Sequence, residues 1–150
     1  MRMDKHQYYL NIALAVSKRS TCLKRHYGCV IVKDDIIIST GYNGSPRSEV
    51  NCCDRGFCKR KDAERYSDYT KCDSVHAEQN ALIAADSDKL IGATVYLACQ
   101  EFRKTFSSPL GEWLNDDTPV PCPICERMLL NARVSRVVNA KGDVNIGTIR

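Results

Sequence analysis

Three side chains that can bind a transition metal occur in two short motifs of this sequence. His76 is followed two residues later by Glu78, and Cys122 and Cys125 lie much further along the chain in a Pro-Cys-Pro-Ile-Cys segment. One imidazole and two thiolates can bind Zn²⁺ and leave one tetrahedral position open. A zinc ion with an open position lowers the pKa of its water to about 7, and a nearby carboxylate can then move protons. The pattern predicts hydrolytic chemistry at zinc, with Glu78 as the catalytic acid–base group.

Both motifs are expected at the starts of helices. Cys122 and Cys125 are three residues apart, so in a first helical turn their side chains point to the same side. The partial positive charge at a helix N-terminus also favours thiolates. Ser74 is expected to cap a second helix, which carries His76 in its first turns and runs to about Ala85. Two helix starts facing each other across a sheet would then supply three ligands to one ion.

A structural zinc clip with Glu78 on the surface is the alternative interpretation of these residues. A closed structural site needs a fourth Cys or His ligand, and the spacings around His76, Cys122 and Cys125 supply none nearby. The sequence therefore favours an open, catalytic site.

The hydrophobic pattern predicts alternating helices and strands in one domain, residues 1–150. Asp4 begins the first helix, and Asp34-Asp35 forms the turn of a β-hairpin. The order of elements predicts a three-layer α/β/α sandwich with a central mixed sheet. The expected elements are helices near 5–19, 74–85 and 122–132, strands 27–33, 36–40, 93–99 and 134–138, and surface loops at 41–61 and 100–120.

Composition narrows the class of protein. Hydrophobic residues make up 43% and charged residues 27% of the 150 residues, as in ordinary globular domains. No apolar run reaches the roughly 18 residues that a membrane span needs, and the first residues contain no signal-peptide core. The expected compartment is the cytosol, without a membrane partner. The basic groups at 18–26 and 55–61 could serve a nucleotide phosphate or RNA, or form a plain solvated face.

Nine cysteines are many for such a chain, and their odd number argues against a fully paired disulfide framework. In a reducing cytosol they are expected as metal ligands or as buried apolar residues. Cys29 and Cys99 fall in strand patterns and are expected in the core. A disulfide-rich secreted protein is accordingly disfavoured.

Beyond the metal motifs, two further segments carry a family resemblance: residues 19–32, which end in Tyr-Gly-Cys-Val-Ile-Val, and residues 41–46, Gly-Tyr-Asn-Gly-Ser-Pro. Together with His-Ala-Glu-Gln-Asn-Ala at 76–81 and Cys-Pro-Ile-Cys at 122–125, the chain resembles the cytidine-deaminase superfamily. Within it, the chain is most similar to the deoxycytidylate (dCMP) deaminases, over about residues 5–138. Residues 50–54 resemble the versions that tailed phages carry.

The resemblance implies zinc-dependent deamination of dCMP to dUMP, which feeds thymidylate synthesis. It also implies a homohexamer that dCTP activates and dTTP inhibits, and a triphosphate effector would bring Mg²⁺ with it. Nucleotides, not nucleic acid, would be the ligands, and the host cytoplasm would be the location of a phage-encoded enzyme. Tyr42, Asn43 and Gly44 correspond to a nucleotide- or effector-binding loop, and Arg25 is the candidate for the substrate phosphate.

The resemblance further implies a second, structural zinc bound by Cys22, Cys52, Cys58 and Cys72. Four thiolates would close such a site and hold the long loop that follows the hairpin. Cys58 matches the family's pattern only with a shift of one residue, so Cys53 is its rival. Reduced, buried cysteines are the alternative.

Departures from the family's pattern and alternative functions must also be considered. Tyr27 and Cys29 stand where the family usually has Val and Ala, so substrate choice could differ. Segment 100–120 is longer than usual and could cover the site or contact another subunit. A dual dCMP/dCTP deaminase of viral type fits the same motifs. A tRNA adenosine deaminase shares the zinc motif but lacks the Gly-Tyr-Asn-Gly segment. A catalytically inactive zinc protein that binds RNA or a partner is disfavoured by the intact Glu78.

Overall fold

The computed structural model describes residues 1–147, so the last three residues of the predicted domain 1–150 lie outside the described part. Its centre is one six-stranded sheet. Five of its strands lie in the order β2-β1-β3-β5-β6, and the sixth strand, β4, pairs with β3. β3 and β5 run parallel while every other pair is antiparallel, which gives the predicted mixed sheet. The strands are β1 (Arg25–Lys33), β2 (Ile36–Tyr42), β3 (Thr94–Arg103), β4 (Glu112–Asp116), β5 (Arg136–Asn139) and β6 (Gly142–Val144).

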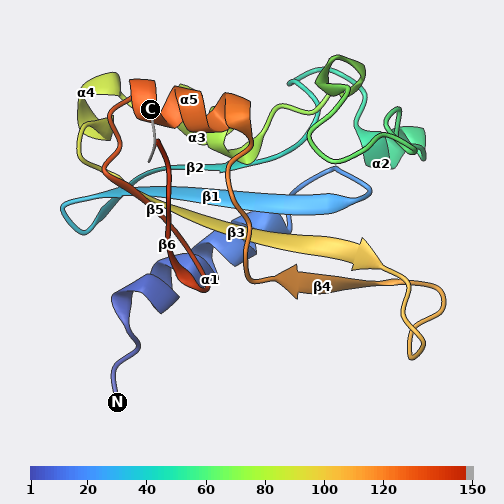
Figure 1. Cartoon of the computed structure of the whole chain (residues 1–150), viewed down its shortest axis with the longest axis horizontal. Coiled ribbons are helices and arrows are strands. Elements are labelled where there is room, and N and C mark those ends of the chain that lie inside the picture. The colour runs from blue at the N-terminus through green and yellow to red at the C-terminus, as the bar shows by residue number, and fades with distance from the viewer. Residues whose placement is uncertain (148–150) are drawn as a thin grey trace.

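Helices cover both faces of this sheet (Figure 1). α1 packs on one face against β1 and β3, whereas α3 packs on the other face against β2 and β1 and beside α5. The predicted three-layer sandwich is therefore confirmed. The helices are α1 (Lys5–Ser17), α2 (Cys52–Arg55), α3 (Ala77–Ile83), α4 (Ser87–Leu90) and α5 (Pro123–Asn131), with a 3-10 helix η1 at Tyr69–Lys71.

Alternation along β1 builds two cores. Cys29 and Ile31 point to the α3/α5 side, where they pack with Leu129, while Val30 and Val32 face α1. Because successive side chains of a strand point to opposite faces, an unbroken apolar run is what a strand covered by helices on both sides requires. Cys29 is fully buried, as expected.

The first helix and the hairpin follow their sequence signals. The Asp4 side chain accepts hydrogen bonds from the backbone N–H groups of His6 and Gln7, so it caps α1. Asp34 and Asp35 take φ values of 50° and 62°, as both central residues of a tight type I′ hairpin turn must. The predicted hairpin pairs as β1 with β2.

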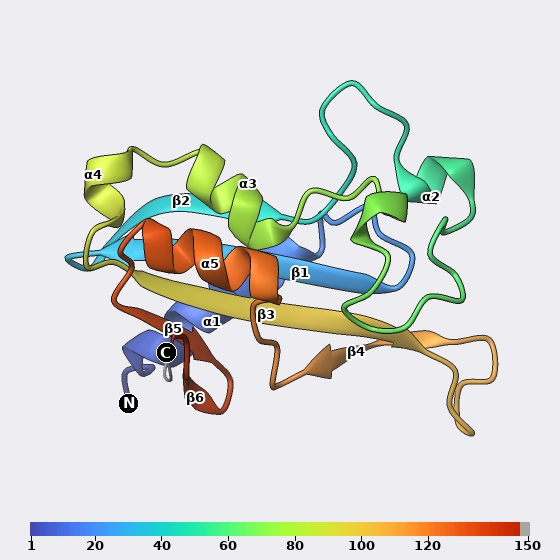
Figure 2. The ribbon, with the colours of Figure 1, turned by 45° about the horizontal axis from the view of Figure 1, so that its top comes forward.

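Residues 100–120, expected to be a surface loop or insertion, contain regular structure, so the expectation of a loop is wrong. β3 continues to Arg103 and the chain returns as β4, which forms a hairpin that projects beyond the rest of the sheet (Figure 2). Trp113 of β4 stacks on His26 of β1 with ring centroids 3.6 Å apart. This contact with β1 holds the half-exposed hairpin in place, and the hydrophobic pattern of residues 100–120 does not predict it.

Among residues 1–147, no helix is long and apolar enough to cross a membrane.

Candidate metal centre and active site

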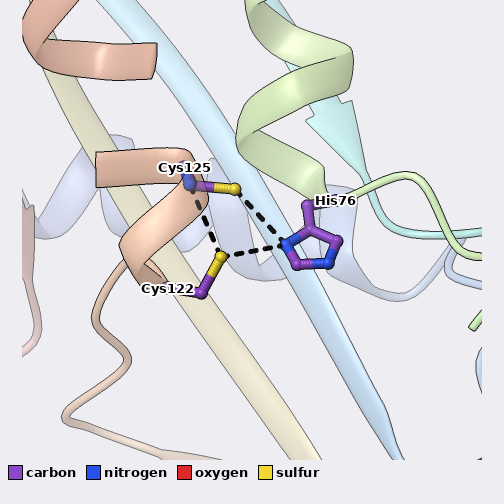
Figure 3. Close-up of side chains that lie close together, drawn as sticks. All are labelled: His76, Cys122 and Cys125. Atoms are coloured by element: carbon purple, nitrogen blue, oxygen red, sulfur yellow. Dashed lines mark hydrogen bonds between the residues drawn. The ribbon is translucent and has the colours of Figure 1, made fainter. Parts of the chain in front are cut away.

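Three side chains from two helix starts converge on one point, as Figure 3 shows. The Nδ1 atom of His76 lies 3.5 Å from Sγ of Cys122 and 3.3 Å from Sγ of Cys125. Zinc–nitrogen and zinc–sulfur bonds of about 2.0 and 2.3 Å that meet at a tetrahedral angle place nitrogen and sulfur about 3.5 Å apart. The three residues therefore fit one zinc ion. They form the one such group of ligands within the described chain.

Local backbone structure fixes the positions of these ligands. Cys122 is the N-cap of α5, and its sulfur accepts a hydrogen bond from the backbone N–H of Cys125 at 3.5 Å. His76 is itself the N-cap of α3, and its N–H donates to the Gln79 side chain at 2.9 Å. The expectation that Ser74 caps this helix is wrong, because His76 is the N-cap and Val75 before it pairs with Gly44 in a β-bridge.

The three metal-binding side chains shift one another's pKa values. Hydrogen bonds with the Cys125 side chain, followed by that with His76, lower the pKa of Cys122 and favour its thiolate form. The Cys122 side chain in turn raises the pKa of both Cys125 and His76. A divalent metal that binds both sulfurs as thiolates would displace any proton that they share.

Glu78 is buried, with 4% of its surface exposed, and it lines the same cavity as His76 and Cys122. Burial is the largest influence on its carboxyl group and raises its pKa above the ordinary value. A carboxyl group with a raised pKa can hold and release a proton nearer to neutral pH, as acid–base catalysis requires.

A cavity of about 470 Å³ opens beside the cluster, which is a size typical of small-molecule sites. One wall comes from the start of β1 and another from the long loop that precedes α3. Tyr69 of η1 lies in this loop with its ring 5.5 Å from the His76 ring. Burial, followed by the neighbouring Cys122 side chain, raises the pKa of Tyr69. Residues 62–72 show no clear hydrophobic period, and nothing in their sequence indicates that Tyr69 belongs to the site.

Arg25 lines this cavity, as expected for a substrate-binding residue, but its charge is already paired. Its guanidinium donates to Glu101 at 2.8 Å and lies 3.8 Å from a carboxylate oxygen of Asp116. Glu101 belongs to β3 and Asp116 to β4, so both partners come from the hairpin that the sequence did not predict.

The Gly-Tyr-Asn-Gly segment, which is expected to bind a nucleotide, also holds the start of β1 in place. Asn43 is buried, accepts from the backbone N–H of Tyr27 at 2.8 Å and donates to the carbonyl of Arg25 at 3.0 Å. Its side chain thereby continues the pairing of β1 beyond the end of β2. Asn43 lines the cavity, whereas Tyr42 is 38% exposed and is not part of the cavity lining.

Gly41 and Gly44, the first and last residues of this segment, allow close packing within the protein. A Cβ atom at Gly41 would lie 2.3 Å from the carbonyl oxygen of Ala77 and 2.5 Å from the nitrogen of Ala81, both in α3. A Cβ at Gly44 would lie 2.7 Å from Oγ1 of Thr21. The close backbone approach that these glycines allow is thus made to α3 and to the loop before β1.

The four cysteines predicted for a second metal gather around the long loop. Cys52 is buried; burial raises the pKa of its thiol, and Cys22, Cys58 and Cys72 add to this as neighbours. Cys53 is exposed and its sulfur lies 3.9 Å from Asp54. The sulfurs do not approach within ligand distance as a group of three in the described part of the chain, so a second zinc stays a prediction.

Comparison with known proteins gives a consistent result. The model of the cytidine and deoxycytidylate deaminase zinc-binding region matches residues 3–141. The deoxycytidylate deaminase of Mycobacterium phage D29 is 35% identical over 147 residues, which cover 93% of this chain and 97% of the phage protein. The deoxycytidylate deaminase of Saccharomyces cerevisiae is 34% identical over 92% of this chain but only 38% of the yeast protein.

Solved structures agree with the sequence relatives. The dCMP deaminase of cyanophage S-TIM5 in apo form superimposes with a TM-score of 0.63 and 26% identity, covering 92% of this chain and 83% of that one. The same enzyme in complex with dCMP and dUMP gives a TM-score of 0.61 and 25% identity, over 91% and 82%. The metal-binding geometry, the fold and the relatives agree, and the chain belongs to the cytidine and deoxycytidylate deaminases.

Proposed function

We propose that this protein catalyses the zinc-dependent hydrolytic deamination of dCMP to dUMP and ammonia, which supplies dUMP for thymidylate synthesis. The observation that carries the proposal is the buried Glu78 beside a ligand set of one imidazole and two sulfurs in a nucleotide-sized cavity. The S-TIM5 relative solved with dCMP and dUMP supports the choice of substrate.

Bound zinc would supply a Lewis acid that lowers the pKa of water at the open coordination position. Glu78 is the group of this chain that moves protons. Its carboxylate takes a proton from the attacking water and delivers it to the ring nitrogen of the pyrimidine. The second proton leaves with the amino group, so that water and dCMP give dUMP and ammonia. Burial of Glu78 keeps bulk water away from this transfer.

Nucleotide contacts are proposed for Arg25, Asn43 and Gly44, with Tyr42 as an effector contact outside the cavity. Arg25 and Asn43 line the cavity, which supports their assignment.

The family resemblance supports regulation of the enzyme, with dCTP as activator and dTTP as inhibitor. It also supports a homohexamer located in the cytoplasm. Mg²⁺ would accompany the triphosphate. Titration with each triphosphate during turnover tests regulation, and sedimentation velocity tests the hexamer.

A second zinc is proposed at Cys22, Cys52, Cys58 and Cys72. Its support is that Cys22, Cys58 and Cys72 line the same cavity and that each adds to the effect of burial in raising the pKa of the Cys52 thiol. A closed site of four thiolates would hold the loop that forms one wall of the cavity.

An ammonia-release assay with dCMP, dCTP, CMP and a tRNA anticodon stem tests the proposed substrate. Turnover of dCMP well above the other three is the expected result. Equal turnover of dCTP would instead show a dual dCMP/dCTP deaminase, and turnover confined to the tRNA stem would overturn the proposal.

A further inference from the structure

Four cationic side chains line the cavity, namely Lys24, Arg25, Arg60 and Arg65, and they differ in what already binds their charge. Arg25 is held by two carboxylates, from Glu101 and Asp116. None of the other three forms an ion pair with a carboxylate of residues 1–147. A phosphate group is bound best by a cation whose charge is not already neutralised.

We propose that Arg60, rather than Arg25, binds the 5′-phosphate of the nucleotide substrate. This inference rests on the proposed function, since it assigns one subsite of the same cavity. It makes the long loop before α3 a determinant of specificity for phosphorylated pyrimidines.

The position of Arg60 places its charge close to the metal centre. Its guanidinium carbon lies 5.1 Å from the centre of the Tyr69 ring, and that ring lies 5.5 Å from the ring of His76. A single aromatic ring, that of Tyr69, therefore separates the Arg60 guanidinium from the metal ligand His76. A nucleotide whose base reaches the metal centre extends its sugar and phosphate over such a distance.

The Arg60 side chain also has an unused donor. One terminal nitrogen donates to the backbone carbonyls of Glu64 and Ser67, which orients the guanidinium. The Nε–H group is buried and has no hydrogen-bond partner within the described residues. A buried cationic donor without an acceptor is unfavourable, and a phosphate oxygen would satisfy it.

Lys24 positions Arg60. Its ammonium group donates to the backbone carbonyls of Arg60 and Lys61, the latter at 2.9 Å. Lys24 directly precedes β1, so these bonds tie the long loop to the strand that begins with Arg25. The basic residues next to β1 thus support the phosphate subsite without forming it.

The test compares the affinity of the zinc-loaded protein for dUMP and for deoxyuridine, which lacks only the phosphate. Isothermal titration should show that Arg60→Gln weakens dUMP binding by about 10- to 100-fold and leaves deoxyuridine binding within about twofold. Arg60→Lys keeps the charge but lacks the Nε–H donor, and an intermediate loss for dUMP is expected. Lys59→Gln is the matched control, because Lys59 pairs with Asp73 and does not line the cavity.

Equal weakening of both ligands by Arg60→Gln would overturn the inference, because it would show a purely structural role for Arg60 in the loop. Unchanged dUMP affinity would overturn it too, as would an equal loss in Lys59→Gln. A thermal melt and zinc analysis establish that each variant is folded and loaded. Failure of the proposed function has a separate signature, since the unaltered protein would then neither bind dUMP nor deaminate dCMP.

Discussion

Sγ of Cys125 lies 3.3 Å from Nδ1 of His76, although 49 residues separate them in the sequence. The contact exists because α3 and α5 lie side by side on one face of the sheet and begin at the same end of it (Figure 2). Each helix start contributes ligands, and the sheet beneath fixes the distance between them. The metal centre is thus a property of the fold as a whole.

Replacement of Glu78 by Gln should abolish turnover while metal binding persists. The amide keeps the shape of the side chain but cannot carry protons, so a loss of about 10²- to 10⁴-fold in kcat is expected. Zinc content, measured by atomic emission, should match that of the unaltered protein. Glu64→Gln is the matched control in the cavity wall and should retain zinc and most of the activity. A Glu78→Gln enzyme with near-normal kcat would rule out the assigned role.

The same substitution should affect stability in a pH-dependent manner. Burial raises the pKa of Glu78 above its ordinary value of 4.5, so the folded state binds this proton more tightly than the unfolded state does. Ionisation of Glu78 therefore costs stability as pH rises above 4.5, and the cost disappears at lower pH. Urea unfolding of the chelator-treated proteins should show Glu78→Gln to be the more stable at pH 7.5, with the difference shrinking towards pH 4. A difference independent of pH would contradict the burial argument.

Much of this architecture could be predicted from sequence, because its signals are local. The Asp4 cap, the Asp34-Asp35 turn and the unbroken apolar run of β1 each specify their own element. The metal ligands could be predicted because few combinations of residues bind zinc. The β3–β4 hairpin could not, since its strands are half exposed and its anchor is the stacking of Trp113 on the distant His26.

The sequence also does not show which cationic side chains of the cavity are paired with carboxylates. Arg25 looks like a free cation in the chain, but folding brings Glu101 to 2.8 Å from it across the β1–β3 pairing. Tyr69 and Arg60 lie in a segment without periodicity, and only the folded loop places Tyr69 beside His76 and Arg60 over the Tyr69 ring. Long-range contacts of this kind leave no local pattern.

Gly41→Ala should loosen the helix that carries His76. The new Cβ would lie 2.3 Å from the carbonyl oxygen of Ala77, so α3 must move away from β2. A loss of about 1–3 kcal/mol in the free energy of unfolding is expected, together with weaker zinc binding. Thr40→Ala, at the exposed neighbouring position of β2, is the control and should alter neither quantity greatly. Unchanged stability in Gly41→Ala would show that the close packing is not needed.

Paired cysteine variants can test the second metal. If Cys58 is a ligand, Cys58→Ser should lower the zinc content from about two ions per chain to about one and should destabilise the loop. Cys53→Ser should keep both ions, because Cys53 is exposed and lies against Asp54. A content of one zinc per chain in the unaltered protein would remove the second site.

We propose that zinc held by His76, Cys122 and Cys125 works with Glu78 to deaminate dCMP. The most direct measurement follows ammonia and dUMP together during incubation of the zinc-loaded protein with dCMP, beside the Glu78→Gln variant of equal zinc content. We expect one ammonia for each dUMP with the unaltered protein and almost none of either product with the variant. Absence of dUMP formation by the zinc-loaded protein, or equal formation by the variant, would contradict it.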